Sequence, residues 1–182
     1  CLALVGRWTS RSIPNQAKPE VVQRMNWNPW SETMANLRLA RTDGLVFRAV
    51  LGISWMWFFG AVFLSQFPSF AKEVLHGDAQ VASLLLVLFS VGIGAGSLLC
   101  EYLSRGRVEM GLSPLGAIGM TLFAVDLYVA ASNLPVSELM GVGAFVAQSA
   151  HWRIMADLLL LSLFTGIYSV PMYALIQIES KA

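Results

Sequence analysis

Four long apolar blocks constrain this 182-residue chain more than any other feature of its sequence. Each block holds about 20 residues, which at ~1.5 Å per helical residue is enough to cross the ~30 Å hydrocarbon core of a bilayer. None of them alternates apolar and polar residues as a strand of a membrane barrel does. The sequence therefore predicts an all-α membrane protein whose transmembrane helices lie at about residues 46–64, 81–103, 112–131 and 154–178.

Composition agrees with this fold class. Hydrophobic residues make up 56% of the chain and charged residues 13%, a balance that leaves a soluble domain of this size short of polar surface. The net charge of +1 does not indicate a nucleic-acid partner. Because the chain begins with Cys1 and shows no signal peptide, we expect it to be an internal piece of a longer protein.

Residues 1–45 precede the first long block. We expect residues 1–6 to end an earlier transmembrane helix and the rest to form a polar linker. The second half of this linker has a helix signature, with Asn28 as N-cap, Pro29 at the first helical position and Gly44 as a stop. Its apolar stripe suits a helix lying on the membrane surface, and an amphipathic helix packed on protein fits equally well.

The connections between the blocks predict the orientation. The linker is rich in basic residues, and the short loop near residue 105 carries Arg105 and Arg107. By contrast, Lys72 is the only Lys or Arg in residues 66–80, and residues 132–152 contain neither. Cytoplasmic loops carry an excess of Lys and Arg. Both ends of the chain are therefore predicted to be cytoplasmic, and residues 46–182 are predicted to form one partial transmembrane bundle.

Glycines and histidines give no sign of cofactor or metal chemistry. Gly92 and Gly96 share one helical face, which predicts close packing against another helix. A dinucleotide-binding loop would need glycine where Ser97 stands. His76 and His151 lack metal-ligand spacing, so we interpret them as loop histidines at a solvated surface and predict no metal and no cofactor.

Two carboxylates fall within the apolar blocks. Asp126 is predicted either to be a proton or substrate site or to make a helix-packing hydrogen bond with a Ser, Thr or Tyr of an adjacent helix. Asp157 is four residues from Arg153, and we expect a local ion pair between them.

Aromatic residues and prolines mark the first and last blocks. Trp55 and its aromatic neighbours cover more than one helical face, so either core packing or the lining of an acyl-chain site explains them. Gln66 with Pro68, and the residues around Pro171, mark places where the helices are expected to break and expose backbone polar groups. Broken helices fit a moving transporter better than a static anchor.

Several segments resemble the C-terminal half of a major facilitator superfamily transporter of the bacterial lysophospholipid transporter branch. The closest likeness is to the form fused to a glycerophospholipid acyltransferase and an AMP-forming acyl-carrier ligase. The segments that carry it are ISWMWFFGAVFLSQFP (53–68), KEVL (72–75), FSVGIGAGSLLCE (89–101), GRVEMGLSPLG (106–116) and the pair Asp126-Leu127.

The resemblance implies a role for several residues. The four blocks would correspond to helices seven to ten of such a transporter, whose first and last members line the central cavity. It therefore implies these substrate-binding candidates: Trp55, Gln66, Tyr168, Tyr173 and Gln177. The cytoplasmic loop motif of the superfamily is matched by Gly96, Glu101, Arg105 and Arg107, although Cys100 stands where the motif has its acid.

The function expected from the resemblance is the transport of lysophospholipids across the bacterial inner membrane by alternating access, coupled to their reacylation. The chain itself is not expected to be an enzyme. Its partners would be membrane lipid, the lysophospholipid, an N-terminal six-helix half, and helices eleven and twelve. The alternatives are a proton-coupled exporter of drugs or other small molecules and a domain that anchors a fused acyltransferase.

Overall fold

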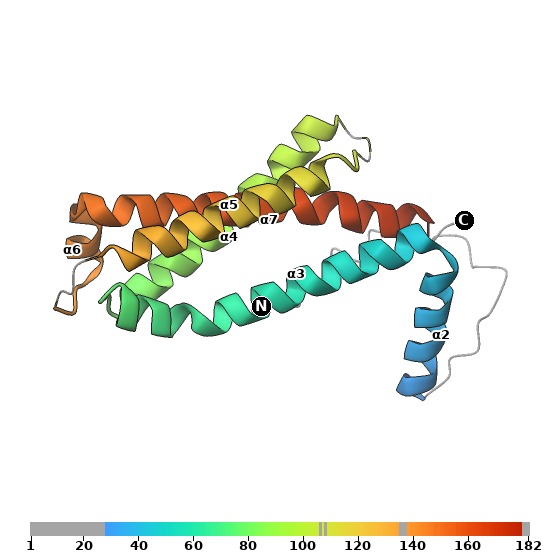
Figure 1. The fold of residues 1–182 in the computed structure, drawn as a ribbon, viewed down its shortest axis with the longest axis horizontal. Helices are drawn as coiled ribbons and strands as arrows, with labels where there is room; N and C mark the ends of the chain where they lie inside the picture. Colours follow the sequence, from blue (N-terminus) through green and yellow to red (C-terminus); the bar gives the residue numbers. More distant parts are fainter. Residues whose placement is uncertain (1–27, 106, 108, 135–137, 180–182) are drawn as a thin grey trace, which may run out of the picture. The chain divides into compact units, whose positions relative to one another are not determined.

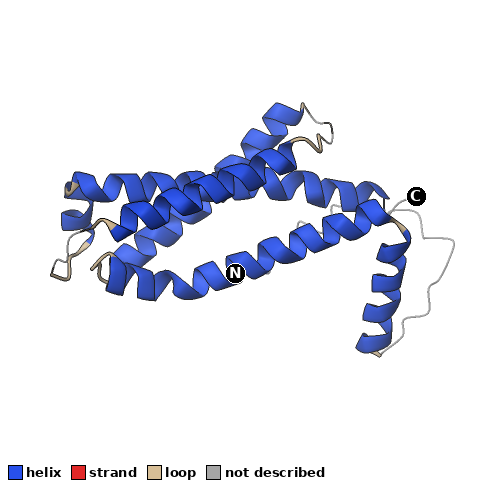
Figure 2. Ribbon diagram, viewed as in Figure 1, coloured by secondary structure: helices blue, strands red, loops and turns tan. Residues whose placement is uncertain are grey.

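The computed structural model describes residues 28–105, 107, 109–134 and 138–179. The chain divides into two compact units, Cys1–Leu37 and Arg38–Ala182. Within the described residues the structure is helices joined by short loops, without an extended strand (Figure 2). The expected end of an earlier helix, the first half of the linker and residues 180–182 lie outside the described residues.

The helix predicted in the linker is α2, Pro29–Thr42. Its start is confirmed, because the Asn28 side chain accepts a hydrogen bond from the Trp30 N–H at 3.2 Å. The predicted stop at Gly44 is wrong. The helix ends two residues earlier, and Gly44 is instead the first residue of the next helix.

Asp43 separates these two helices and caps the second. Its Oδ1 accepts hydrogen bonds from the N–H groups of Leu45 and Val46 at 2.7 and 3.3 Å, which satisfies two N–H groups that have no partner within the helix. The second helix, α3, runs over Gly44–Ser69. Asp43 is thus an N-cap signal in the sequence that explains why the helix begins there.

The expected break near Gln66 and Pro68 is wrong, because α3 passes through Pro68 without interruption. It continues as a π-helical turn, η1, Phe70–Val74, in which the Leu75 N–H donates to the Phe70 carbonyl at 3.1 Å. The wider turn keeps the backbone hydrogen-bonded beyond the proline, whose ring nitrogen has no N–H to donate.

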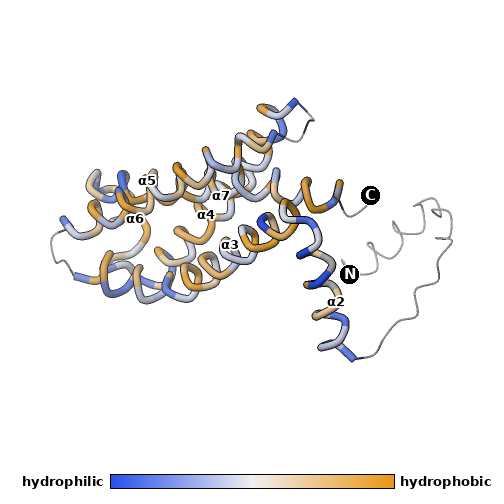
Figure 3. Tube along the Cα trace, turned by 45° about the vertical axis from the view of Figure 1, so that its right-hand side comes forward, coloured by the Kyte–Doolittle hydropathy of each residue, from blue (hydrophilic) through white to orange (hydrophobic). Residues whose placement is uncertain are grey.

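The other three long helices are α4 Ala79–Ser104, α5 Leu112–Ser132 and α7 Ser149–Glu179. Together with α3 and η1 they are long and apolar enough to cross a membrane, so the predicted all-α membrane fold is confirmed at that level. Apolar residues dominate their middle parts and polar residues gather near their ends (Figure 3). The break expected at Pro171 is also wrong, since α7 runs through it.

Helix α7 is the central helix of the bundle and contacts the other three long helices. It packs along α4 and α5 and less extensively against α3 (Figure 1). A Cβ on Gly92 would meet Ser162 and the Leu159 carbonyl of α7, and a Cβ on Gly96 would meet the Leu163 backbone. The predicted close packing at these two glycines is therefore confirmed.

A short helix, α6 Val142–Ala147, was not predicted and precedes α7. It explains why the solvated position expected for His151 is wrong. The His151 side chain is only 3% exposed, its Nδ1 lies 2.9 Å from the Phe145 carbonyl oxygen, and its ring stacks on Phe145 with the centroids 4.1 Å apart. His151 therefore anchors α6 to the start of α7.

Candidate functional site

A cavity of about 480 Å³ lies between α3, α5 and α7. Helix α5 supplies most of its wall, α3 supplies an aromatic wall, and α7 supplies a single tyrosine. Its lining residues are Trp55, Met56, Phe59, Ala117, Met120, Thr121, Ala124, Val125, Tyr128 and Tyr168. The surface is thus apolar except for the indole N–H, the Thr121 hydroxyl and two tyrosine hydroxyls.

Tyr168 reaches this cavity because glycines face it on both neighbouring helices. A Cβ on Gly52 of α3 would lie 2.6 Å from the Tyr168 Oη, and a Cβ on Gly116 of α5 would lie 2.7 Å from the Tyr168 Cβ. Both distances are shorter than any side chain tolerates. The two glycines therefore create the space that lets a large side chain of α7 stand between α3 and α5.

The aromatic wall leaves the cavity open to one side. Trp55 is 68% exposed and its ring packs against that of Phe58 at an interplanar angle of 39°, with 5.7 Å between the ring centroids, and Tyr128 on the opposite wall is 74% exposed. Large aromatic rings with one polar group suit a site that holds an apolar chain beside a polar group. The arrangement can bind an elongated apolar molecule by burial of surface.

The structure brings together two of the five residues predicted for substrate binding. Trp55 and Tyr168 both line the 480 Å³ cavity. Gln66 lines a separate cavity of about 100 Å³ with neighbours that are all apolar. Tyr173 lies outside both cavities and accepts a hydrogen bond from the Trp57 Nε1 at 2.5 Å, and Gln177 is an exposed residue near the end of α7.

Sequence reasoning missed the contribution of α5. The resemblance assigned the cavity lining to the first and last of the four helices, yet Ala117, Thr121, Ala124 and Tyr128 of α5 follow one another at helical spacing along a single face and line the cavity. The signal was present in the sequence, because small residues followed by a tyrosine at i, i+4, i+7 and i+11 share one side of a helix.

Within the predicted cytoplasmic loop motif, Gly96 stands apart from the three charged residues. Gly96 is buried against α7, whereas Glu101, Arg105 and Arg107 are exposed at the end of α4 and beyond it. Arg105 ends the helix in the left-handed conformation with φ of 50°. Among the described residues, no ion pair joins Glu101 to either arginine.

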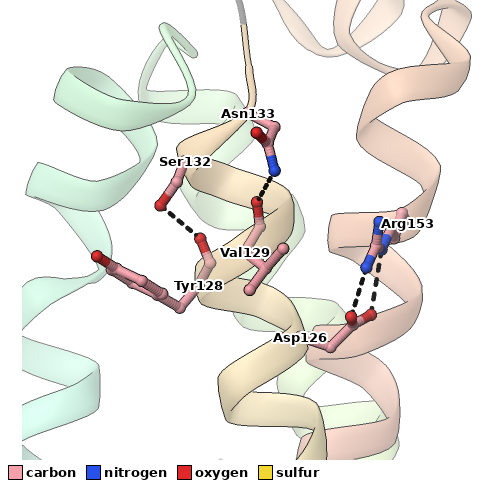
Figure 4. Close-up of polar contacts among 6 residues, drawn as sticks. All are labelled: Asp126, Tyr128, Val129, Ser132, Asn133 and Arg153. Carbon is pink, nitrogen blue, oxygen red and sulfur yellow. Dashed lines mark hydrogen bonds and ion pairs between the residues drawn. The ribbon is translucent and has the colours of Figure 1, made fainter.

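A charged pair joins α5 to α7 at the end of the bundle nearest α6. The Arg153 Nε and Nη2 donate to the Asp126 Oδ2 and Oδ1 at 3.1 and 2.5 Å (Figure 4). The Ser, Thr or Tyr partner expected for Asp126 is therefore wrong. So is the local ion pair expected between Arg153 and Asp157, since the guanidinium turns to the neighbouring helix instead.

This pair stands apart from the cavity. Asp126 points from α5 toward α7, whereas Tyr128, two residues later, points away from Arg153 (Figure 4). Two residues correspond to ~200° around a helix, so the two side chains must leave α5 on opposite sides. Among the described residues, no group of three His, Cys, Asp or Glu side chains is placed to hold a metal ion.

Comparison with known proteins identifies no relative: no protein-family model, no curated protein and no solved structure matches the chain. The fold and the cavity define an all-α, multi-pass membrane protein.

Proposed function

We propose that the chain is part of a membrane transporter that moves lysophospholipids across the bacterial inner membrane by alternating access, with both ends of the chain in the cytoplasm. The observation that carries the proposal is the cavity between α3, α5 and α7, which has aromatic and aliphatic walls and four polar groups. A lysophospholipid has a single acyl chain to bury and a polar head to leave at a wetter edge. The transported lipid would then be available for reacylation on the cytoplasmic side.

The cavity fits this substrate class better than a small polar one. Burial of apolar surface contributes about 25 cal/mol per Å², so an acyl chain is held by its length without specific polar contacts. The few hydroxyl groups of Thr121, Tyr128 and Tyr168 limit the number of hydrogen bonds that a polar ligand forms there. The resemblance to the lysophospholipid transporter branch supports the same substrate.

Two other functions remain as outcomes of the test. A proton-coupled exporter would be served by an intramembrane acid such as Asp126, whose side chain is bound to Arg153 on the other side of α5 from the cavity. A domain that only anchors a fused acyltransferase would have no use for the cavity.

The test fills the cavity in the full-length transporter. Ala117→Trp places an indole against the cavity wall, and Ile118→Trp adds the same side chain one residue away, at an exposed position outside the cavity lining. Uptake of labelled lysophosphatidylethanolamine into spheroplasts is measured for both. We expect Ala117→Trp to slow uptake about tenfold or more, which corresponds to ~1.4 kcal/mol, and Ile118→Trp to leave it near the parent rate.

Three results would contradict the proposal. Equal uptake by both variants, at matched amounts of folded protein in the membrane, would favour the anchor. Absence of lysolipid uptake by the parent, together with export of a drug that depends on the proton gradient, would favour the exporter. Equal loss in both variants would show that added bulk on α5, and not the filled cavity, is responsible.

A further inference from the structure

Two carboxylates and one guanidinium meet where α5 faces α7. Arg153 is bound to Asp126 through two hydrogen bonds, and Asp157 lies one turn after Arg153 on α7. All three residues lie within helices long and apolar enough to span a membrane.

Asp157 is the buried member of this group. It is 4% exposed, and its Oδ2 is shielded from solvent without a hydrogen-bond partner among the described residues. Asp126 and Arg153, by contrast, keep 37% and 56% of their side chains exposed. At the position of Asp157, an ionised carboxylate would need a cation or hydrogen-bond donors, because burial removes its water.

The described surroundings supply no second cation. Helix α3 has no ionisable residue between Arg48 and Lys72, α4 has no charged residue between Asp78 and Glu101, and α6 has none at all. Helix α5 contributes Asp126 alone to this side, since Tyr128 points away from Arg153 (Figure 4).

On α7, the nearest other titratable group is His151. Its Nδ1 is engaged with the Phe145 carbonyl. It therefore anchors α6, and among the described residues no hydrogen bond or ion pair joins its ring to Asp126 or Asp157. Arg153 is left as the one cation for two acids in this described part of the bundle.

We propose that Asp126, Arg153 and Asp157 form a site for a single proton, which is carried by Asp157. Asp157 is buried and the guanidinium is already bound to Asp126, so the neutral acid is the form of Asp157 that costs less free energy here. Asp126 is ionised because the guanidinium binds both of its oxygens. With the proton on Asp157, the group carries one negative and one positive charge and is neutral within the membrane.

The site also links protonation to the contact between α5 and α7. When Asp157 releases its proton to water, two carboxylates compete for one guanidinium. Arg153 is one helical turn from Asp157, which is the spacing at which the two side chains meet. Loss of the proton therefore draws Arg153 away from Asp126 and weakens the bond between the helices.

This inference goes beyond lysophospholipid transport and does not rest on it, since it needs only that the helices lie in a membrane. The test is correspondingly independent of uptake. Infrared spectra of the full-length protein in lipid nanodiscs are recorded near neutral pH, and each variant is subtracted from the parent. A protonated carboxylic acid has a C=O stretching band that is separate from the bands of carboxylates.

Asp157→Asn is expected to remove one such acid band, because the proton-carrying group is gone. Asp126→Asn is expected to remove the same band although Asp157 is still present. In that variant Arg153 is free to pair with Asp157, one carboxylate is balanced by one guanidinium, and no proton is held. Glu109→Gln, at an exposed carboxyl outside the helices, is the control and should leave the band unchanged.

Two results overturn the proposal. An acid band that is unaffected by Asp157→Asn shows that Asp157 is ionised in the parent. A band that persists in Asp126→Asn shows that Asp157 keeps a proton by burial alone and that the two carboxyls do not share a site. If Asp157→Asn fails to fold, as judged from the amide band of the same spectra, Asp126→Asn alone decides, because it retains both Asp157 and Arg153.

Discussion

Gly96 of α4 lies directly against the backbone of Leu163 in α7, so close that a Cβ on the glycine would overlap the Leu163 carbonyl. The relationship is reciprocal, because a Cβ on Gly166 of α7 would meet the Ile93 carbonyl oxygen of α4 at 2.5 Å. Backbones of two helices that touch in this way are held by van der Waals packing, which is the main force between helices in lipid. The contact joins α4 to the helix on which the rest of the bundle is built.

Replacement of Gly96 by alanine should therefore destabilise the bundle. The added Cβ would meet the Leu163 backbone, which cannot rotate aside as a side chain can. Overpacking of this kind costs about 1–3 kcal/mol. Gly94→Ala is the matched control on the same helix, because nothing lies within 4 Å of a Cβ there. Alanine at that position should be neutral or stabilise by up to about 1 kcal/mol.

The measurement is unfolding of the protein in detergent micelles by titration with SDS, followed by loss of helical circular dichroism. Similar shifts for the two alanine variants would contradict the packing argument, since only one of these glycines is in contact with α7.

The charged group between α5 and α7 predicts an unequal response to loss of its members. Asp126→Asn leaves Arg153 with a second carboxyl, Asp157, one turn away, so the cation can find a new partner. Arg153→Gln leaves both carboxyls without a cation. We expect a larger fall in the melting temperature for Arg153→Gln than for Asp126→Asn, measured by thermal denaturation in the same detergent.

The order of these two melting temperatures is the test. If Asp126→Asn is the more damaging variant, the guanidinium cannot turn to Asp157, and the bond between the helices depends on Asp126 alone. A Lys replacement of Arg153 is a useful comparison, because it keeps the charge but loses the two-pronged geometry.

His151 predicts a different kind of loss. Its ring both bonds the Phe145 carbonyl and stacks on the Phe145 ring, so His151→Ala should release α6 from α7 and destabilise the protein by about 1–3 kcal/mol. His151→Phe keeps the stacking and loses only the hydrogen bond, so it should lose less. Proteolysis within residues 133–148, followed by mass spectrometry, measures the release, and equal cleavage in both variants and the parent would refute it.

The four membrane-spanning helices could be predicted from the sequence because apolar length is a local property. Their predicted bounds differ from the observed ones mainly at the ends, where capping decides the outcome. Capped by Asp43, α3 begins at Gly44, two residues before the predicted start. Helix α7 begins at Ser149 instead of 154, where His151 joins it to α6. The helix break predicted at Pro68 did not occur, because the backbone beyond the proline stays hydrogen-bonded through a π-helical turn. No pattern in the sequence indicates such a turn.

The candidate site could be predicted only in part because it depends on contacts between helices. Trp55 and Tyr168 were expected on the cavity, but the sequence does not say that Gly52 and Gly116 make room for the tyrosine. The partner of Asp126 is 27 residues away on another helix, beyond any local pattern. The sequence predicted an ion pair between Arg153 and Asp157, four positions away on the same helix. In the structure α5 lies beside α7, and Arg153 pairs with Asp126 instead.

The proposed orientation in the membrane predicts which loops are reachable from each side. Single cysteines are placed at two exposed sites, Arg107→Cys beyond α4 and Glu138→Cys beyond α5, in a cysteine-free background of the full-length protein. An impermeant maleimide added to intact spheroplasts should label the cysteine at 138 and not the one at 107. After permeabilisation, both should be labelled to a similar extent.

The reason is the uneven distribution of basic residues, which favours the loop that contains Arg105 and Arg107 on the cytoplasmic side. The two sites are separated by α5 alone, whose 21 residues span ~30 Å at ~1.5 Å per residue, so they must lie on opposite sides if α5 crosses the bilayer. Labelling of both sites in intact spheroplasts would contradict a membrane-spanning α5. Labelling of 107 alone would keep the fold but reverse the orientation, and with it the cytoplasmic position proposed for the ends of the chain.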